Sequence, residues 1–102
     1  MQSMYTYSVA EELSFDWDKD NVEHLAAHAI APDEVEQVFA NEPLDIDFDV
    51  AGNEERWTSI GHTNLLRVLI VGWAMRNGSV RCITAFETSR ARRTEYFGAK
   101  GF

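Results

Sequence analysis

Charged side chains carry most of the chemical potential of this sequence, and they are unevenly distributed along it. Residues 1–55 hold 15 Asp and Glu against one Lys, whereas residues 56–102 hold seven Arg and one Lys against two Glu, and the net charge is −8. Either the two halves neutralise each other in the fold, or a basic face is kept for an anionic partner.

Three of the arginines crowd one short stretch near the end of the chain. Arg90, Arg92 and Arg93 follow Thr88 and Ser89, either of which can cap a helix that begins there. The helix dipole disfavours cations in a first turn. This local conflict indicates that the arginines serve a function.

Two further patterns raise the question of a metal ion. His24 and His28 have helical spacing, but no Cys or third His stands near them and no His-Glu-x-x-His pattern occurs. A group of carboxylates has the oxygen ligands that a divalent cation prefers, although a solvated or arginine-facing strand face explains it more simply. We therefore expect no metal and no cofactor. These carboxylates are Asp45, Asp47, Asp49 and Glu54.

The length and the cysteine content limit the class of protein. A chain of 102 residues fits one domain that buries a core without disulfides. The single cysteine, Cys82, lies in an apolar run and is expected to be a buried thiol. No targeting segment or membrane span is visible, so we expect a soluble cytoplasmic protein.

The elements that position these side chains centre on one hairpin. Two apolar runs, Arg67–Met75 and Val80–Ala85, are joined across Asn77-Gly78, which suits a type I′ turn. The first run lacks polar alternation, so it predicts a central strand that is covered on both faces. Residue 81 then pairs with residue 74. This register places Arg81, Ile83 and Ala85 on one face with Ala74, Gly72 and Ile70.

The rest of the chain supplies the cover. Alternation predicts short strands near Leu13–Trp17, Leu44–Phe48 and Glu55–Gly61, and helical periodicity predicts helices over Lys19–His28, from Pro32 to Asn41, and after Ser89. The first helix would begin with a capping box of Asp20 and Glu23 and bury Val22, Leu25, Ala26 and Ala29.

These elements predict one α+β domain with a small antiparallel sheet of three to four strands, two N-terminal helices and one C-terminal helix. The predicted domain spans residues 13–97, after an N-terminal extension of residues 1–12 that is either an edge strand or a frayed end. A tail of residues 98–102 follows it.

Seven segments occur in an order and spacing typical of a known family. Together they resemble the BrnT family, the toxin components of type II toxin-antitoxin systems, whose fold is related to RelE toxins. The resemblance covers about residues 13–97. The segments are Phe15–Asp18, Asn21–His28, Pro32–Phe39, Glu54–Trp57, Ile60–Thr63, Arg81–Ala85 and Ser89–Tyr96.

The resemblance implies a metal-independent ribonuclease that a cognate antitoxin neutralises, the antitoxin also repressing their shared operon. The reaction is attack of a ribose 2′-hydroxyl on the adjacent phosphate, which requires a general base, a general acid and cations around the phosphorane. Arg, Lys and His suffice for such a site, and loops and strand ends on one sheet face would hold it.

The chain departs from the family pattern at several positions. Phe86 stands where the family has an arginine at the end of the last strand, and Glu87 follows it. His62 stands where the family commonly has arginine, and Ala27-His28-Ala29 replaces a basic helix end with its usual glycine. Several cations of the expected site are therefore missing.

The retained residues define a candidate site. We assign catalytic roles to His62, Arg67 and Arg81, because histidine exchanges protons near neutral pH and arginine stabilises phosphate charge. RNA phosphates would contact Arg90, Arg93 and Arg56. Three alternatives stay open: His62 is a turn residue without a specific partner, Arg81 extends from beneath a helix, and Tyr96 is a packing residue rather than a catalytic hydroxyl.

Two functions are compatible with this sequence. The first is an active ribonuclease toxin, and the second is a toxin-like domain that has lost catalysis and binds or regulates a protein partner. A basic cleft that joins Arg67, Arg81 and Arg90 would favour the enzyme, whereas arginines paired with the aspartates of 45–49 would argue against it. An antitoxin would bind at a strand edge or at an apolar patch near Trp57 or Phe97.

Overall fold

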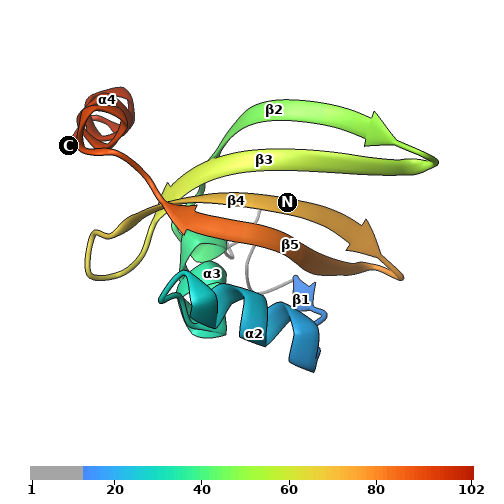
Figure 1. Ribbon diagram of the computed structural model, residues 1–102. Helices are drawn as coiled ribbons and strands as arrows, with labels where there is room; N and C mark the ends of the chain where they lie inside the picture. The colour runs from blue at the N-terminus through green and yellow to red at the C-terminus, as the bar shows by residue number, and fades with distance from the viewer. Residues whose placement is uncertain (1–12) are drawn as a thin grey trace, which may run out of the picture.

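The computed structural model describes residues 13–102, which form one twisted sheet with helices on both faces (Figure 1). The elements in chain order are β1 (Ser14–Phe15), α2 (Lys19–Ala27), α3 (Pro32–Ala40), β2 (Leu44–Ala51), β3 (Glu54–His62), β4 (Val68–Arg76), β5 (Ser79–Glu87) and α4 (Arg90–Lys100). The α+β class is confirmed.

The sheet has five strands in the order β1-β5-β4-β3-β2, and it is mixed. Strands β2 to β5 are antiparallel neighbours, whereas Ser14 and Phe15 pair in parallel with Ser79 and Val80 of β5. The prediction of a three- to four-stranded antiparallel sheet was therefore wrong in number and kind. The fifth strand is only two residues long, and a run that short gives no signal of direction.

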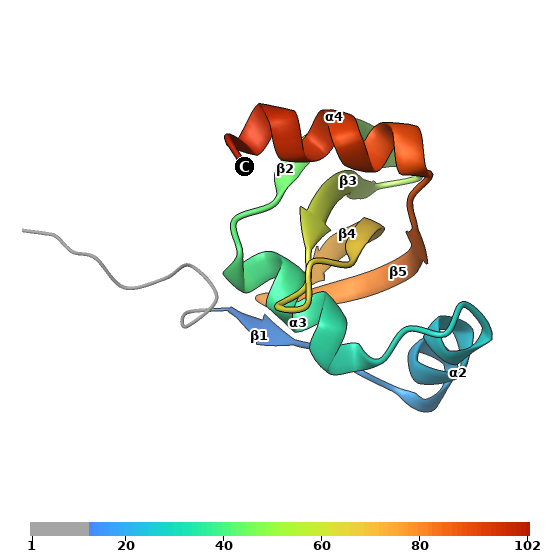
Figure 2. The ribbon, with the colours of Figure 1, turned by 90° about the vertical axis from the view of Figure 1, so that its left-hand side faces the viewer.

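Helices α2 and α3 lie on one side of the sheet, and α4 lies on the other side at one end (Figures 1 and 2). We call the two sides the α3 face and the α4 face. The main core fills the α3 face, where Leu25, Val35 and Val38 from the helices pack with Leu69 and Val71 of β4. A smaller cluster on the α4 face joins Ile60, Val68, Ile70 and Tyr96. Strand β4 is thus covered on both faces at its start, while Met75 and Arg76 at its end are exposed.

The predicted turn is present. Asn77 and Gly78 both have positive φ, +53° and +80°, as a type I′ turn requires. Arg81 pairs with Ala74 as expected. Beyond it a bulge at Ile83 shifts the register, because Gly72 pairs with Thr84 and Trp73 with Cys82. The predicted shared face was therefore wrong for Ala85, which pairs with Val71 and lies in the core on the α3 face.

The helix ends explain two further differences. Helix α2 is capped by Asp18, which accepts a hydrogen bond from the Asn21 amide, and not by the Asp20 and Glu23 pattern. Val22 is 37% exposed, whereas Asn21 is buried and donates to the Cys82 carbonyl. The buried stripe is thus rotated towards β5. Helix α4 is capped by Ser89, as expected, and continues through Lys100 to Gly101, beyond the predicted start of the tail.

Candidate functional site

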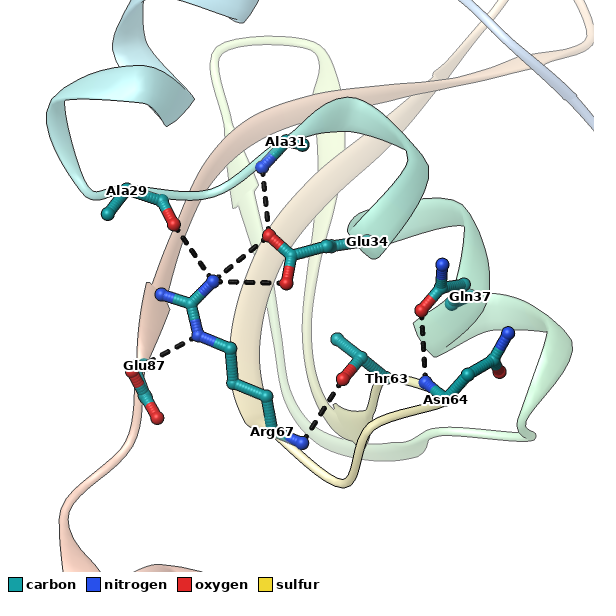
Figure 3. Close-up of polar contacts among 8 residues, drawn as sticks. All are labelled: Ala29, Ala31, Glu34, Gln37, Thr63, Asn64, Arg67 and Glu87. Atoms are coloured by element: carbon teal, nitrogen blue, oxygen red, sulfur yellow. Dashed lines mark hydrogen bonds and ion pairs between the residues drawn. The ribbon is translucent and has the colours of Figure 1, made fainter.

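Arg67 lies in the connection before β4 and is held by four acceptor atoms (Figure 3). Its Nη1 donates to the Ala29 carbonyl at 2.8 Å and to both carboxylate oxygens of Glu34 at 3.0 and 3.1 Å, and its Nε donates to Glu87 at 3.1 Å. The contacts come from the α2–α3 connection, the first turn of α3 and the end of β5. Arg67 therefore joins three segments that are distant in sequence.

The electrostatics of Arg67 fit a structural ion pair. Burial opposes its charge, but hydrogen bonds to Glu34 and Glu87 outweigh that effect and raise the pKa of Arg67 above its ordinary value. Glu34 also accepts from the Ala31 amide at the start of α3, so it links the guanidinium to the helix N-terminus. The Nε and Nη1 donors of Arg67 are therefore directed at protein acceptors.

His62 ends β3 and lies under α4. Its Nδ1 is 2.6 Å from the Tyr96 hydroxyl, and both side chains are buried. Phe97 and Phe102 place their rings 6.2 and 5.1 Å from the imidazole. Burial lowers the pKa of His62, and the Lys100 ammonium lowers it further, so the imidazole is neutral near pH 7. His62 thus has a specific partner, unlike an ordinary turn histidine.

Arg81 lies in β5, and its side chain binds the N-terminus of α2. Its Nη1 donates to Asp18 at 2.9 Å and to the Asn21 side-chain oxygen at 3.2 Å. The hydrogen bond to Asp18 raises the pKa of Arg81. The Asn21 amide and Arg81 together lower the pKa of the Asp18 carboxyl. Arg81 therefore stabilises the helix cap and ties α2 to β5.

These three residues occupy separate places. His62 contacts α4 on one face of the sheet, whereas Arg67 contacts α3 on the other. Arg81 pairs with Ala74, seven residues along β4 from Arg67, which is about 23 Å at about 3.3 Å per residue. Arg67 and Arg81 therefore do not line one basic cleft. The partners of Arg67 and Arg81 are also not the aspartates of β2 but acids elsewhere.

The arginines of α4, unlike Arg67 and Arg81, form no ion pairs with acids among the described residues. Arg90 and Arg92 are exposed, and their side chains have no hydrogen-bond or ion-pair partner within residues 13–102. Arg93 donates to the Leu66 carbonyl at 3.2 Å, and its guanidinium lies 4.8 Å from the centre of the Phe97 ring. Arg56 pairs with Glu54 at 3.1 Å at the other end of the sheet. Three exposed arginines thus cluster on the first turns of α4, while Arg76 is a separate exposed cation at the end of β4.

Phe86 determines the character of the sheet beside α4. It pairs with Ile70 on the α4 face and is 41% exposed. With Ile60, Val68 and Tyr96 it makes this surface apolar, where the family resemblance implies an arginine. The His62–Tyr96 pair is the polar contact within it.

The partners of the arginines were not predicted. The predicted cap of the first helix was Asp20 with Glu23, so Asp18 and Glu34 received no role as arginine partners, and Glu87 was noted only as the residue after Phe86. Spacing along one strand cannot show which acid lies opposite an arginine in space. Only the charge division gave a signal, and it holds for Arg67 with Glu34 and for Arg81 with Asp18, which join the acidic half to the basic half.

No metal-ligand group emerges from the part of the chain that the structure describes. His24 and His28 place their rings 5.4 Å apart, but residues 13–102 contain no cluster of three or more His, Cys, Asp or Glu side chains that could hold an ion. The aspartates of β2 do not share one face as predicted, because a bulge at Ile46 turns Asp45 towards Ser59 on the α3 face. In the same range no helix is long and apolar enough to cross a membrane.

The fold and site define a small α+β domain with a helix-capped sheet and a basic C-terminal helix. The family model for BrnT, the ribonuclease toxin of type II toxin-antitoxin systems, matches residues 17–93, more than half of the chain. The chain therefore belongs to the BrnT toxin family. No curated protein matches it.

Proposed function

We propose that this chain is the toxin of a type II toxin-antitoxin system, a cytoplasmic metal-independent ribonuclease that a cognate antitoxin neutralises. The family match over residues 17–93 carries this proposal. The arrangement of α4 supports it, because a neutral histidine, a tyrosine hydroxyl and exposed arginines gather at one end of the sheet.

In this proposal His62 is the acid–base group. A histidine that is neutral near pH 7 accepts a proton from a ribose 2′-hydroxyl, and its hydrogen bond to Tyr96 fixes the orientation of the ring. Arg90 and Arg93 contact RNA phosphates from α4. Arg67 and Arg81 support the site by holding α3 and α2 on the sheet. RNA reaches His62 only when the aromatic cover of Phe97 and Phe102 moves aside.

A second function is favoured by one specific observation. Arg67 and Arg81 are both engaged in ion pairs, and Phe86 replaces the expected strand-end cation, so the phosphorane would meet few positive groups. In this alternative the chain keeps the toxin fold and acts as a binding or regulatory module for a protein partner.

Cleavage of RNA by the purified protein in EDTA distinguishes the two. The test set is the native chain, His62→Gln, and the double variant Arg90→Ala/Arg93→Ala. The matched control is Arg76→Ala, which removes an exposed cation at the hairpin end of the sheet. Thermal unfolding of each protein confirms that it is folded.

The ribonuclease proposal expects cleavage by the native chain and the control, loss of activity in His62→Gln, and a raised KM in the double arginine variant. Equal cleavage by all four proteins would reject these site assignments and point to a contaminating nuclease. No cleavage by folded native protein would favour the binding module.

A further inference from the structure

Strand β2 is a long free edge. It ends the sheet, and its outer side has no partner strand among the residues that the structure describes (Figure 1). The opposite edge is β1, which is only two residues long. An eight-residue edge strand presents a row of unpaired backbone N–H and C=O groups, which is a template for another strand.

The side chains of β2 are sorted by face beyond the bulge at Ile46. Phe48 and Val50 pair with Trp57 and Glu55 on the α3 face, and they are 51% and 54% exposed. Asp47 and Asp49 point to the α4 face, opposite Thr58 and Arg56. The edge therefore has one apolar side and one acidic side along residues 47–50.

The apolar side continues into a row of aromatic rings. Phe48 packs on Trp57 at 5.3 Å between ring centres, Trp57 stacks on Trp73 at 5.0 Å, and Trp73 meets Phe39 at 5.2 Å. A groove of about 520 Å³ begins at Trp57, inward of Phe48, and is lined also by Trp73, Phe39, Pro43 and Met75. The surface beside the edge thus accepts large apolar side chains.

The acidic side restricts what can pair there. On the α4 face this hairpin carries Asp47, Asp49 and Glu54, and Glu54 pairs with Arg56, so Asp47 and Asp49 supply the excess negative charge. A second copy of this chain would bring like charges opposite one another across the new strand pair, which is destabilising. A strand whose polar side chains are lysine or arginine meets the opposite charge. The charges therefore select against self-pairing and in favour of a basic segment.

We propose that the antitoxin contributes an extended segment that alternates basic and apolar residues and adds to β2 as a sixth strand. Its basic side chains lie over Asp47 and Asp49, and its apolar side chains lie beside Phe48 and Val50. The proposal rests on the proposed function for the existence of an antitoxin. The recognition mode is strand addition, with backbone hydrogen bonds for affinity and alternating side chains for specificity.

The test uses the full-length chain with the antitoxin protein encoded beside it. Hydrogen exchange of the complex is expected to show new protection at the β2 amides between residues 47 and 51 that face away from β3, among them Val50, whose N–H otherwise donates to the Asp49 side chain. The double charge reversal Asp47→Lys/Asp49→Lys is expected to weaken the affinity for the antitoxin by about 10-fold or more, because each attraction between opposite charges becomes a repulsion. The matched control is Asp33→Lys, an exposed acid on α3 that lies off the edge.

Several results would overturn the proposal. One is unchanged affinity in the double variant, and another is protection confined to α3 or α4, which would indicate a partner helix elsewhere. Protection of β2 in the chain alone, rising with concentration, would assign the edge to a second copy. Absence of any complex would reject it as well. RNA cleavage by the free double variant tests the proposed function separately. Asp47 and Asp49 are not among the proposed site residues His62, Arg90 and Arg93, so a loss of antitoxin binding with cleavage retained concerns β2 alone.

Discussion

The two ends of the sheet are built from the same strands but are fixed in opposite ways. At the loop end, which contains His62, Arg67 and Glu87, polar side chains form hydrogen bonds with one another, and helices cover both faces of the sheet. At the hairpin end, which contains the Ala51–Glu54 and Arg76–Ser79 turns, β2, β3 and β4 extend past the helices and expose Val50 and Met75, whereas Val80 of β5 stays buried.

A small domain must use some charged residues for stability and leave others for binding. Arg67 and Arg81, which were predicted from the sequence to be catalytic, attach helices to the sheet. The tip of the β2–β3 hairpin has no helix over it, so its exposed apolar and acidic side chains are available for a partner. Five substitutions or conditions test this division, from the largest expected effect to the smallest.

Replacing Arg67 with Met should lower the free energy of unfolding by about 2–3 kcal/mol. The change leaves Glu34 and the Ala29 carbonyl without their donor, and an unpaired, partly buried charge is costly. Chemical denaturation measures it. Arg90→Met is the matched control and should change stability by about 0.5 kcal/mol or less. Equal effects of the two would contradict the assignment of Arg67 to structure.

Replacing Gly61 with Ala should cost about 2 kcal/mol. A Cβ at this position of β3 would lie 2.6 Å from the Val38 side chain and 3.0 Å from Pro43, so α3 must move away from the sheet. The control is Gly98→Ala in α4, where a Cβ meets no atom within 4 Å. That change should be neutral or stabilising, because alanine favours helix. Thermal unfolding of both variants checks the contrast.

Replacing Tyr96 with Phe should cost about 1 kcal/mol. The substitution keeps the aromatic packing on Ile60 and Ile70 but leaves His62 Nδ1 without its partner. The measurement is urea denaturation at pH 7.5, where the imidazole is neutral. A stability equal to that of the native chain would show that the hydrogen bond contributes nothing to the fold.

The stability of the protein should fall as the pH drops below about 6.5. Burial lowers the pKa of His62 in the folded state, so the unfolded chain, with the ordinary value of 6.5, binds the proton first and is favoured as the pH falls. The loss is complete once the pH passes below the folded-state pKa. Denaturation between pH 8 and 5 should show this slope in the native chain, and His62→Gln should reduce it.

Replacing Phe48 with Thr at the hairpin end should change stability by about 0.5 kcal/mol or less. The ring is half exposed, and threonine suits an edge strand. Denaturation and antitoxin affinity are measured together. A large loss of stability would show that the exposed edge supports the fold and would remove the contrast between the two ends.

Local rules predicted what depends on neighbours in sequence. The Asn77-Gly78 turn, the Ser89 cap and the central position of β4 follow from turn chemistry, capping and apolar patterning. The family could also be recognised, because its segments are spread over most of the chain.

Single-residue irregularities and spatial pairs were not predicted. The bulges at Ile46 and Ile83 reassign the faces of Asp45 and Ala85, and no residue type marks them in advance. The parallel pairing of β1 and the acids that bind Arg67 depend on contacts between distant segments. Candidate site residues chosen by type alone were therefore separated once these contacts were known.

The bulge at Ile83 sets the phase of everything that follows it in β5. Counting from the Arg81–Ala74 pair without the extra residue, Glu87 would lie opposite Val68 on the α4 face. With the bulge, Glu87 lies opposite Leu69 and reaches Arg67, and Phe86 rather than Glu87 occupies the α4 face. A one-residue deletion that removes the bulge would keep Phe86 opposite Ile70 and Glu87 opposite Leu69, so the contact of Glu87 with Arg67 would be retained. Strand β5 can therefore lose one residue at the bulge without a change in the charge of the surface beside α4.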